Sequence, residues 1–97
     1  MNHIAQTIYN QFGGHKAMYM IGANNMTYDT NAFMFRFKMC KKFNHCTITL
    51  NSNDLYDVRF CKIWGCDIKR DVTFNDVYCD KLVKLFEEQT QLNTVLF

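Results

Sequence analysis

The sequence of 97 residues contains no proline, only four glycines and a single tryptophan. The lack of proline excludes a proline-rich linker and any turn that a proline ring would fix. The net charge is also low, because 11 basic residues against 9 acidic ones give 11 − 9 = +2. So mild a balance does not by itself predict nonspecific binding to nucleic acid or to a membrane. A hydrophobic share of 48% excludes intrinsic disorder, and the length predicts one domain over residues 1–97.

Long apolar runs and export signals are also lacking. The longest strongly apolar stretch, Ala17 to Ala23, has seven residues, whereas a membrane-spanning helix needs about 20. The first residues, MNHIAQTIYN, lack the basic and apolar regions of a signal peptide. We therefore expect an intracellular protein without membrane contact.

The five cysteines form no Cys-x-x-Cys pair, and an odd number without an export signal predicts free thiols. We expect Cys46 and Cys79, which lie on apolar-patterned segments, to be small core residues. Structural zinc sites need ligand pairs on tight knuckles. Cys40 and Cys46 are separated by five residues, and Cys46 and Cys61 fall within expected strands, so we expect no metal. The following residues are left open to a role beyond packing: Cys40, Cys46, Cys61, Cys66 and His45.

No arrangement typical of catalysis is present. His45 adjoins Cys46, but neighbours on a strand point to opposite faces, which leaves only Cys40 or Cys61 to pair with a histidine. Gly13-Gly14 lacks the phosphate-loop pattern G-x-x-x-x-G-K-[ST] and is expected to close a helix, not to open one. We therefore expect that the protein is not an enzyme and uses no cofactor.

Helical spacing occurs near both ends of the sequence. Apolar residues recur at every fourth position from about His3 to Phe12, which predicts a helix that Gly13-Gly14 ends. A second helix is predicted from about Asp76 to Thr90. Thr73 precedes Asp76 by three residues, as in a capping box with aspartate in place of glutamate.

Strand patterns fill the middle of the sequence. The apolar run from Lys16 to Ala23 predicts a strand, and the asparagines after it predict a turn. In the segment from Ala32 to Met39, Phe33, Phe35, Phe37 and Met39 alternate with Met34, Arg36 and Lys38, which is typical of a half-buried strand. Two further strands, over 46–50 and 56–61, flank a hairpin turn at 51–54. Gly65 marks the end of the last strand or a bulge, and residues 62–73 are expected to be extended or irregular.

The expected element order is α-β-β-β-β-α. Consecutive strands joined by short turns form an antiparallel sheet, here of three to four strands. The N-terminal and C-terminal helices cover one face of it, which gives a two-layer α+β sandwich. The expected core consists of Ile8, Phe12, Phe33, Phe35, Phe37, Ile48, Leu50, Val58, Phe60, Leu82 and Phe86.

One cluster of charge stands out, because four basic residues and no acidic one occur between positions 36 and 42. If the phenylalanines of that strand face the helices, the basic side chains project from the open face of the sheet. Such a surface suits phosphate groups or an acidic protein partner. The alternative is a solvated outer face without a binding role. The candidate binding residues are Arg36, Lys38, Lys41, Lys42 and Arg59.

Three segments resemble a family of small, largely uncharacterised phage and mobile-element proteins. QFGGHKAMYMIGANN resembles the F-G-G…M-x-G-A-x-N opening of that family, and ITLNSNDLYDVRFCKIWG resembles its L-N-x-x-D-x-Y-D-V-x-F centre. DVYCDKLVKLFEEQTQL is similar to its closing helix. The loop MCKKFNHC departs from the family in its cysteines and histidine. The resemblance implies a phage or mobile-element origin but no activity and no catalytic residue.

Small phage proteins without catalytic residues mostly act by binding. We therefore expect a non-enzymatic protein of the anti-defence or host-takeover type, which binds and inhibits or redirects a host protein or complex in the host cell cytoplasm. The alternative is a small nucleic-acid-binding module, whose helix–sheet–helix order resembles the double-stranded RNA-binding domain. Against it, NDVYCDKLVK lacks the lysine cluster that opens the second helix of that domain. The oligomeric state, a homodimer included, stays open.

Overall fold

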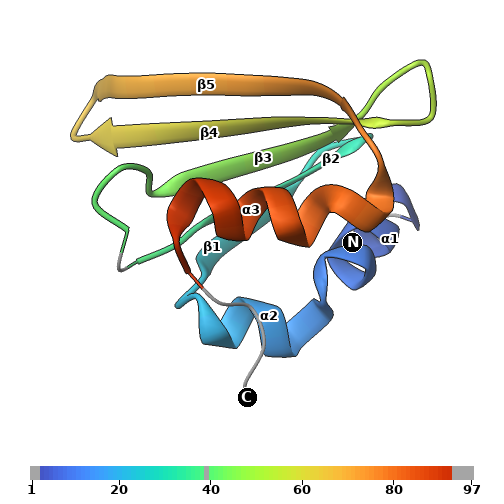
Figure 1. The fold of residues 1–97 in the computed structure, drawn as a ribbon, viewed down its shortest axis with the longest axis horizontal. Coiled ribbons are helices and arrows are strands. Elements are labelled where there is room, and N and C mark those ends of the chain that lie inside the picture. Colours follow the sequence, from blue (N-terminus) through green and yellow to red (C-terminus); the bar gives the residue numbers. More distant parts are fainter. Residues whose placement is uncertain (1–2, 39, 93–97) are drawn as a thin grey trace.

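The computed structural model describes residues 3–38 and 40–92. Their strands form one antiparallel five-stranded sheet in the order β1-β2-β3-β4-β5 (Figure 1). The elements are α1 (His3–Phe12), α2 (Gly14–Met20), β1 (Asn24–Tyr28), β2 (Ala32–Arg36), β3 (His45–Leu50), β4 (Tyr56–Trp64), β5 (Asp67–Val77), the 3-10 turn η1 (Cys79–Lys81) and α3 (Leu82–Thr90).

The helices lie on one side of the sheet and leave its other face open (Figure 1). The expected fold class, an α+β two-layer sandwich with helices at both ends of the chain, is confirmed. The sheet has five strands, not three or four. One face of each central strand is therefore available to solvent or to a partner.

Phenylalanine rings fill the space between the sheet and the helices. Phe35 of β2 contacts Phe12 of α1 with ring centroids 5.3 Å apart and Phe86 of α3 at 6.0 Å. Phe86 also contacts Phe37, at 5.0 Å, and Phe60 of β4, at 6.1 Å. The predicted core residues are buried, except that Leu50 is half-buried and packs against the core. These rings fix which face of the sheet is covered.

The strand predicted over Lys16 to Ala23 is wrong, because this segment forms α2 and the turn after it. A strand would place residues 17, 19 and 21 on one face, yet Tyr19 is 79% exposed while Ala17 and Ile21 are buried. Helical spacing instead brings Ala17, Met18 and Ile21 onto the core. Gly13 does end α1, but the glycine after it begins α2, so the pair also opens a helix.

One edge strand differs from expectation, and the other agrees with its extended alternative. Residues 24–28, which were expected to be loop, form β1, an exposed strand that pairs with β2. Residues 62–73, which were expected to be extended or irregular, belong mostly to β4 and β5, with Gly65 at the turn between these strands. β2 ends at Arg36, before Phe37, and Met39 lies outside the described residues.

The C-terminal helix begins later in the sequence than predicted. Thr73 and Asp76 lie in β5, so they form no capping box, and α3 begins at Leu82. The pairing of Phe74 with Val58 across the strands keeps this segment extended, because Phe74 reaches the ring of Phe60. Cys79 is exposed, so its predicted place in the core is wrong as well.

Candidate binding surface

Antiparallel pairing brings most of the basic residues to one end of the sheet. β2 and β4 end there and β3 and β5 begin there, on the left of Figure 1. Four residues of the predicted patch are exposed at this end, on β2 and the loop that follows it. The β4–β5 hairpin adds three basic residues that the sequence analysis did not include. We call this surface the basic end: Arg36, Lys38, Lys41, Lys42, Lys62, Lys69 and Arg70.

Four carboxylates lie toward the opposite end of the sheet, whereas Asp67 lies at the basic end and pairs with Lys69 over 3.7 Å. Asp29 lies in the β1–β2 turn, and Asp54 lies in the β3–β4 turn. Asp57 and Asp76 lie where β4 begins and β5 ends, and both accept hydrogen bonds from the Asn51 side chain, at 3.0 and 2.9 Å. The formal net charge of +2 therefore conceals a marked separation of charge along the strands.

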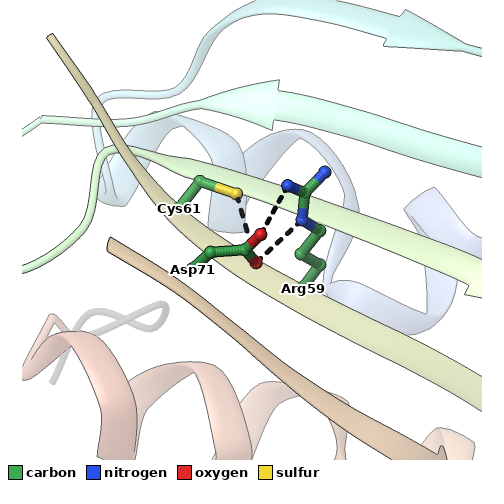
Figure 2. Close-up of polar contacts among 3 residues, drawn as sticks. All are labelled: Arg59, Cys61 and Asp71. Carbon is green, nitrogen blue, oxygen red and sulfur yellow. Dashed lines mark hydrogen bonds and ion pairs between the residues drawn. The ribbon is translucent and has the colours of Figure 1, made fainter. Parts of the chain in front are cut away.

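Arg59, the fifth predicted binding residue, lies on β4 away from the basic end and has its charge partnered. Its Nε and one terminal nitrogen donate to the two carboxylate oxygens of Asp71 on β5, at 2.9 and 2.6 Å (Figure 2). This hydrogen bonding from Arg59 holds the pKa of Asp71 below its usual value and raises that of Arg59. The paired Arg59 offers less charge to a partner than the predicted patch assumed.

The thiol of Cys61 approaches the same carboxylate from the other side. Its Sγ donates to Asp71 Oδ1 over 3.9 Å, and Figure 2 shows Asp71 between Cys61 and Arg59. Burial raises the pKa of the Cys61 thiol, and the opposing effect of Arg59 does not reverse this. Burial raises the pKa of Cys46 far more, on the core face. Neither thiol is therefore activated as a thiolate.

His45 occupies the same row of the open face, where its register partners are Arg36 on β2 and Cys61 on β4. Its Nδ1 is buried without a hydrogen-bond partner among the described residues. Burial lowers the pKa of His45, and the positive charges of Arg36 and Arg59 lower it further. The ring is therefore neutral at neutral pH and does not add to the positive surface.

This low pKa predicts a loss of stability in mild acid. Below the ordinary histidine pKa of about 6.5 the unfolded chain binds a proton that folded His45 resists, so unfolding becomes easier as the pH falls. We expect the thermal midpoint to fall between about pH 7.5 and pH 5.5, and His45→Asn to flatten that fall. Hydrogen bonding from Arg59 lowers the pKa of Asp71, so Asp71 stays ionised throughout this window. His15→Asn is the control because His15 is exposed; parallel curves for all three proteins would contradict the prediction.

The described residues were also compared with the geometry of a metal site. No three His, Cys, Asp or Glu side chains in residues 3–38 and 40–92 are arranged to hold a metal ion. Cys61, the register partner of His45 on β4, has a raised pKa, and His45 lies near the positive charges of Arg36 and Arg59.

The hairpin turn between β4 and β5 places an aromatic side chain beside the basic end. Trp64, the last residue of β4, is 69% exposed. Sequence reasoning missed Trp64 and the hairpin cations because it expected residues 62–73 to be extended or irregular and placed no hairpin there. Gly65, which has a φ of 63°, was the available signal, since a turn there returns residues 67–70 alongside β4.

Comparison with known proteins gives no relative. No family model matches the sequence, and neither the curated proteins nor the solved structures contain a significant match. Among the described residues, no helix has the length and apolar character needed to cross a membrane.

Proposed function

We propose that this chain is a small non-enzymatic protein of phage or mobile-element origin that binds and inhibits or redirects a host protein or complex, in the anti-defence or host-takeover manner. The observation that supports this proposal is the unpaired charge of four residues of the basic end, although Lys69 there pairs with Asp67. Arg36, Lys38, Lys41 and Lys42 are exposed there and form no ion pair with any residue in the described ranges.

Electrostatic complementarity explains how such a surface selects a partner. Unpaired cations on one end of a small domain attract a surface of opposite charge and orient it during the encounter. The carboxylates at the far end of the sheet repel that surface, so the two ends of the domain are not equivalent. We therefore assign the contact to the basic end, with an acidic host protein as the partner.

A second candidate, nucleic-acid binding, is favoured by one specific observation. The exposed Trp64 offers a ring for base stacking within the hairpin that also bears Lys62, Lys69 and Arg70. The protein partner remains the first candidate, because the open face of the central strands presents threonine, histidine and methionine with no exposed aromatic residue.

The double variant Arg36→Glu/Lys38→Glu tests the proposal. We expect it to lose the partner captured from nuclease-treated host lysate and to keep its thermal stability, because exposed charges contribute less than about 1 kcal/mol per pair. The control is His3→Glu/His15→Glu/Lys16→Glu, which makes the same change in net charge at exposed positions away from the basic end. Quantitative capture by the wild type and both variants is the measurement.

Two results would contradict the proposal. A partner that the Arg36→Glu/Lys38→Glu protein still captures would place the contact elsewhere. Captured material that disappears on nuclease treatment would favour the nucleic-acid candidate. In that case affinity should fall log-linearly with salt, with a slope near −0.9 per contacted phosphate on duplex DNA.

A further inference from the structure

His45 stands on the open face of the sheet, on the side away from the helices. The next residue of β3, Cys46, is buried in the core, and successive residues of a strand point to opposite faces. Register pairs His45 with Arg36 on β2 and with Cys61 on β4. The histidine therefore occupies a row across the central strands, between the positions of a guanidinium and a thiol.

The hydrogen bonding of this histidine is incomplete. Its Nδ1 atom is buried and has no hydrogen-bond partner in the part of the chain that the structure describes. Buried polar atoms in folded proteins are nearly always hydrogen-bonded, because removal from water without a partner costs free energy. The fold thus leaves on its open face a polar ring whose hydrogen bonding the described chain does not complete.

The strands on both sides of His45 present positive charge to it. Arg36 is exposed and forms no ion pair with a described residue, and Lys38, two residues further on, is exposed as well. Arg59 lies two residues before Cys61 on β4, and its charge also acts on the ring. Asn24, the register partner of Arg36 on β1, carries no charge. The nearest strands therefore offer the ring cations and no anion.

The anion of this row, Asp71, is already engaged. It lies on β5, one strand beyond Cys61, and both of its carboxylate oxygens accept hydrogen bonds from Arg59 (Figure 2). Burial raises the pKa of the Cys61 thiol, so this thiol carries no negative charge at neutral pH. Arg36 and His45 are thus left beside each other without an acceptor, and an anionic group with hydrogen-bond acceptors matches what they lack.

We propose that a carboxylate of the protein partner binds on the open face against Arg36 and His45, and that His45 takes up one proton from the solvent as the carboxylate binds. The guanidinium and the protonated ring both donate hydrogen bonds to the carboxylate. The inference rests on the proposed function in that this carboxylate belongs to the acidic partner of the basic end.

Linkage gives the sign of the pH dependence. In the free protein, burial and the charges of Arg36 and Arg59 lower the pKa of His45. A bound carboxylate opposes these effects, so the pKa of His45 is higher in the complex. Between the two pKa values the complex holds more protons than the free protein, and affinity rises as the pH falls through that interval. The contact is therefore stronger in mild acid, where the free fold is less stable.

An acidic peptide tests this site without knowledge of the partner. The probe is a tetramethylrhodamine-labelled peptide of about ten residues in which aspartate alternates with glycine, because aspartate stays ionised above about pH 5. Anisotropy with the full chain gives its affinity at constant salt in phosphate-free buffer, and circular dichroism confirms that the chain is folded at each pH. We expect the affinity to rise at least about threefold from about pH 7.5 to about pH 5.5.

Protein variants then locate the contact. Arg36→Gln should weaken the peptide by about fivefold or more, whereas Lys16→Gln, which removes the same charge at an exposed position of α2, should leave its affinity within about twofold. His45→Asn should abolish the rise in affinity in mild acid, and His15→Asn should retain it.

Nuclear magnetic resonance gives a readout in the unaltered chain. We expect saturating peptide to raise the pKa of His45 in a titration of the ring signals. The rings of His3 and His15, which are exposed on the helices, serve as internal references. This measurement holds even if His45→Asn fails to fold.

Several outcomes would overturn the inference. A His45 pKa that the peptide leaves unchanged would show that no proton is taken up, and equal losses in Arg36→Gln and Lys16→Gln would show attraction by net charge alone. A labelled oligothymidylate of the same length that binds more tightly than the peptide, and that needs Arg36 and His45, would make phosphate the ligand. Loss of the cellular partner in Arg36→Glu/Lys38→Glu together with pH-independent peptide binding would support the proposed function and overturn only this inference.

Discussion

Replacing Phe35 with alanine should lower the free energy of unfolding by about 3–5 kcal/mol, as burial of a large aromatic ring implies. Phe35 is fully buried and contacts the rings of Phe12, Phe33, Phe37 and Phe86 at centroid distances of 5.3 to 6.0 Å. It therefore joins β2 to both α1 and α3. Small domains are stable by only about 5–15 kcal/mol, so this single change removes a large part of the total. Denaturant unfolding monitored by circular dichroism is the measurement.

Met34→Ala is the matched control for this prediction. Met34 precedes Phe35 on β2, points to the open face, and is only half-buried. Its truncation should have a clearly smaller effect, because it leaves no cavity between the sheet and the helices. An unchanged midpoint for Phe35→Ala, or equal losses for the two variants, would mean that the faces of β2 are reversed.

Replacing Gly13 with alanine should also destabilise the protein, by about 2–4 kcal/mol, from backbone strain together with an atomic overlap. Gly13 joins α1 to α2 with a φ of 124°, which L-residues rarely adopt. A Cβ at this position would lie 2.8 Å from the Cβ of Ala17, a buried residue of α2. Relief of this overlap would move α2 away from the core. The lower stability of the Gly13→Ala protein should therefore appear as a lower midpoint in thermal unfolding.

Gly65→Ala separates the two causes of this loss. Gly65 also has a positive φ, of 63°, but a Cβ there would have no atom within 4 Å. A left-handed conformation costs an L-residue about 1–2 kcal/mol, so the Gly65 variant should lose only that amount. Equal losses at the two positions would contradict the argument that contact with α2 sets the larger cost at Gly13.

Several parts of the fold were predictable because their signals are local. The phenylalanines of β2 recur at every second residue, which is the period of a strand with one uniformly covered face. The turn at residues 51–54 combines asparagine and aspartate, which favour turns. The side-chain oxygen of Asn51 accepts hydrogen bonds there from the backbone N–H groups of Asn53 and Leu55. For the same reason the basic residues at 36–42 were found, since they are neighbours in sequence.

The errors occurred where local pattern is ambiguous. The short apolar run from Lys16 to Ala23 suits a strand or a helix, and only the packing of Ala17, Met18 and Ile21 against the core decides for α2. β1 and β5 are edge strands with mostly exposed residues, so neither has an alternation that its sequence could reveal. Their backbone pairing with β2 and β4 holds them extended instead.

The sequence by itself determined the two-layer class, the covered face of the central strands and the first four cations of the basic end. These follow from periods of two and four residues and from adjacency, which a linear pattern records. Only the tertiary structure decided that Asp71 pairs with Arg59, that Lys62, Lys69 and Arg70 join the basic end, and that His45 lies beside Arg36 on the open face. Each of these depends on which strands are neighbours and in what register, and register is fixed by the whole core and by no single segment.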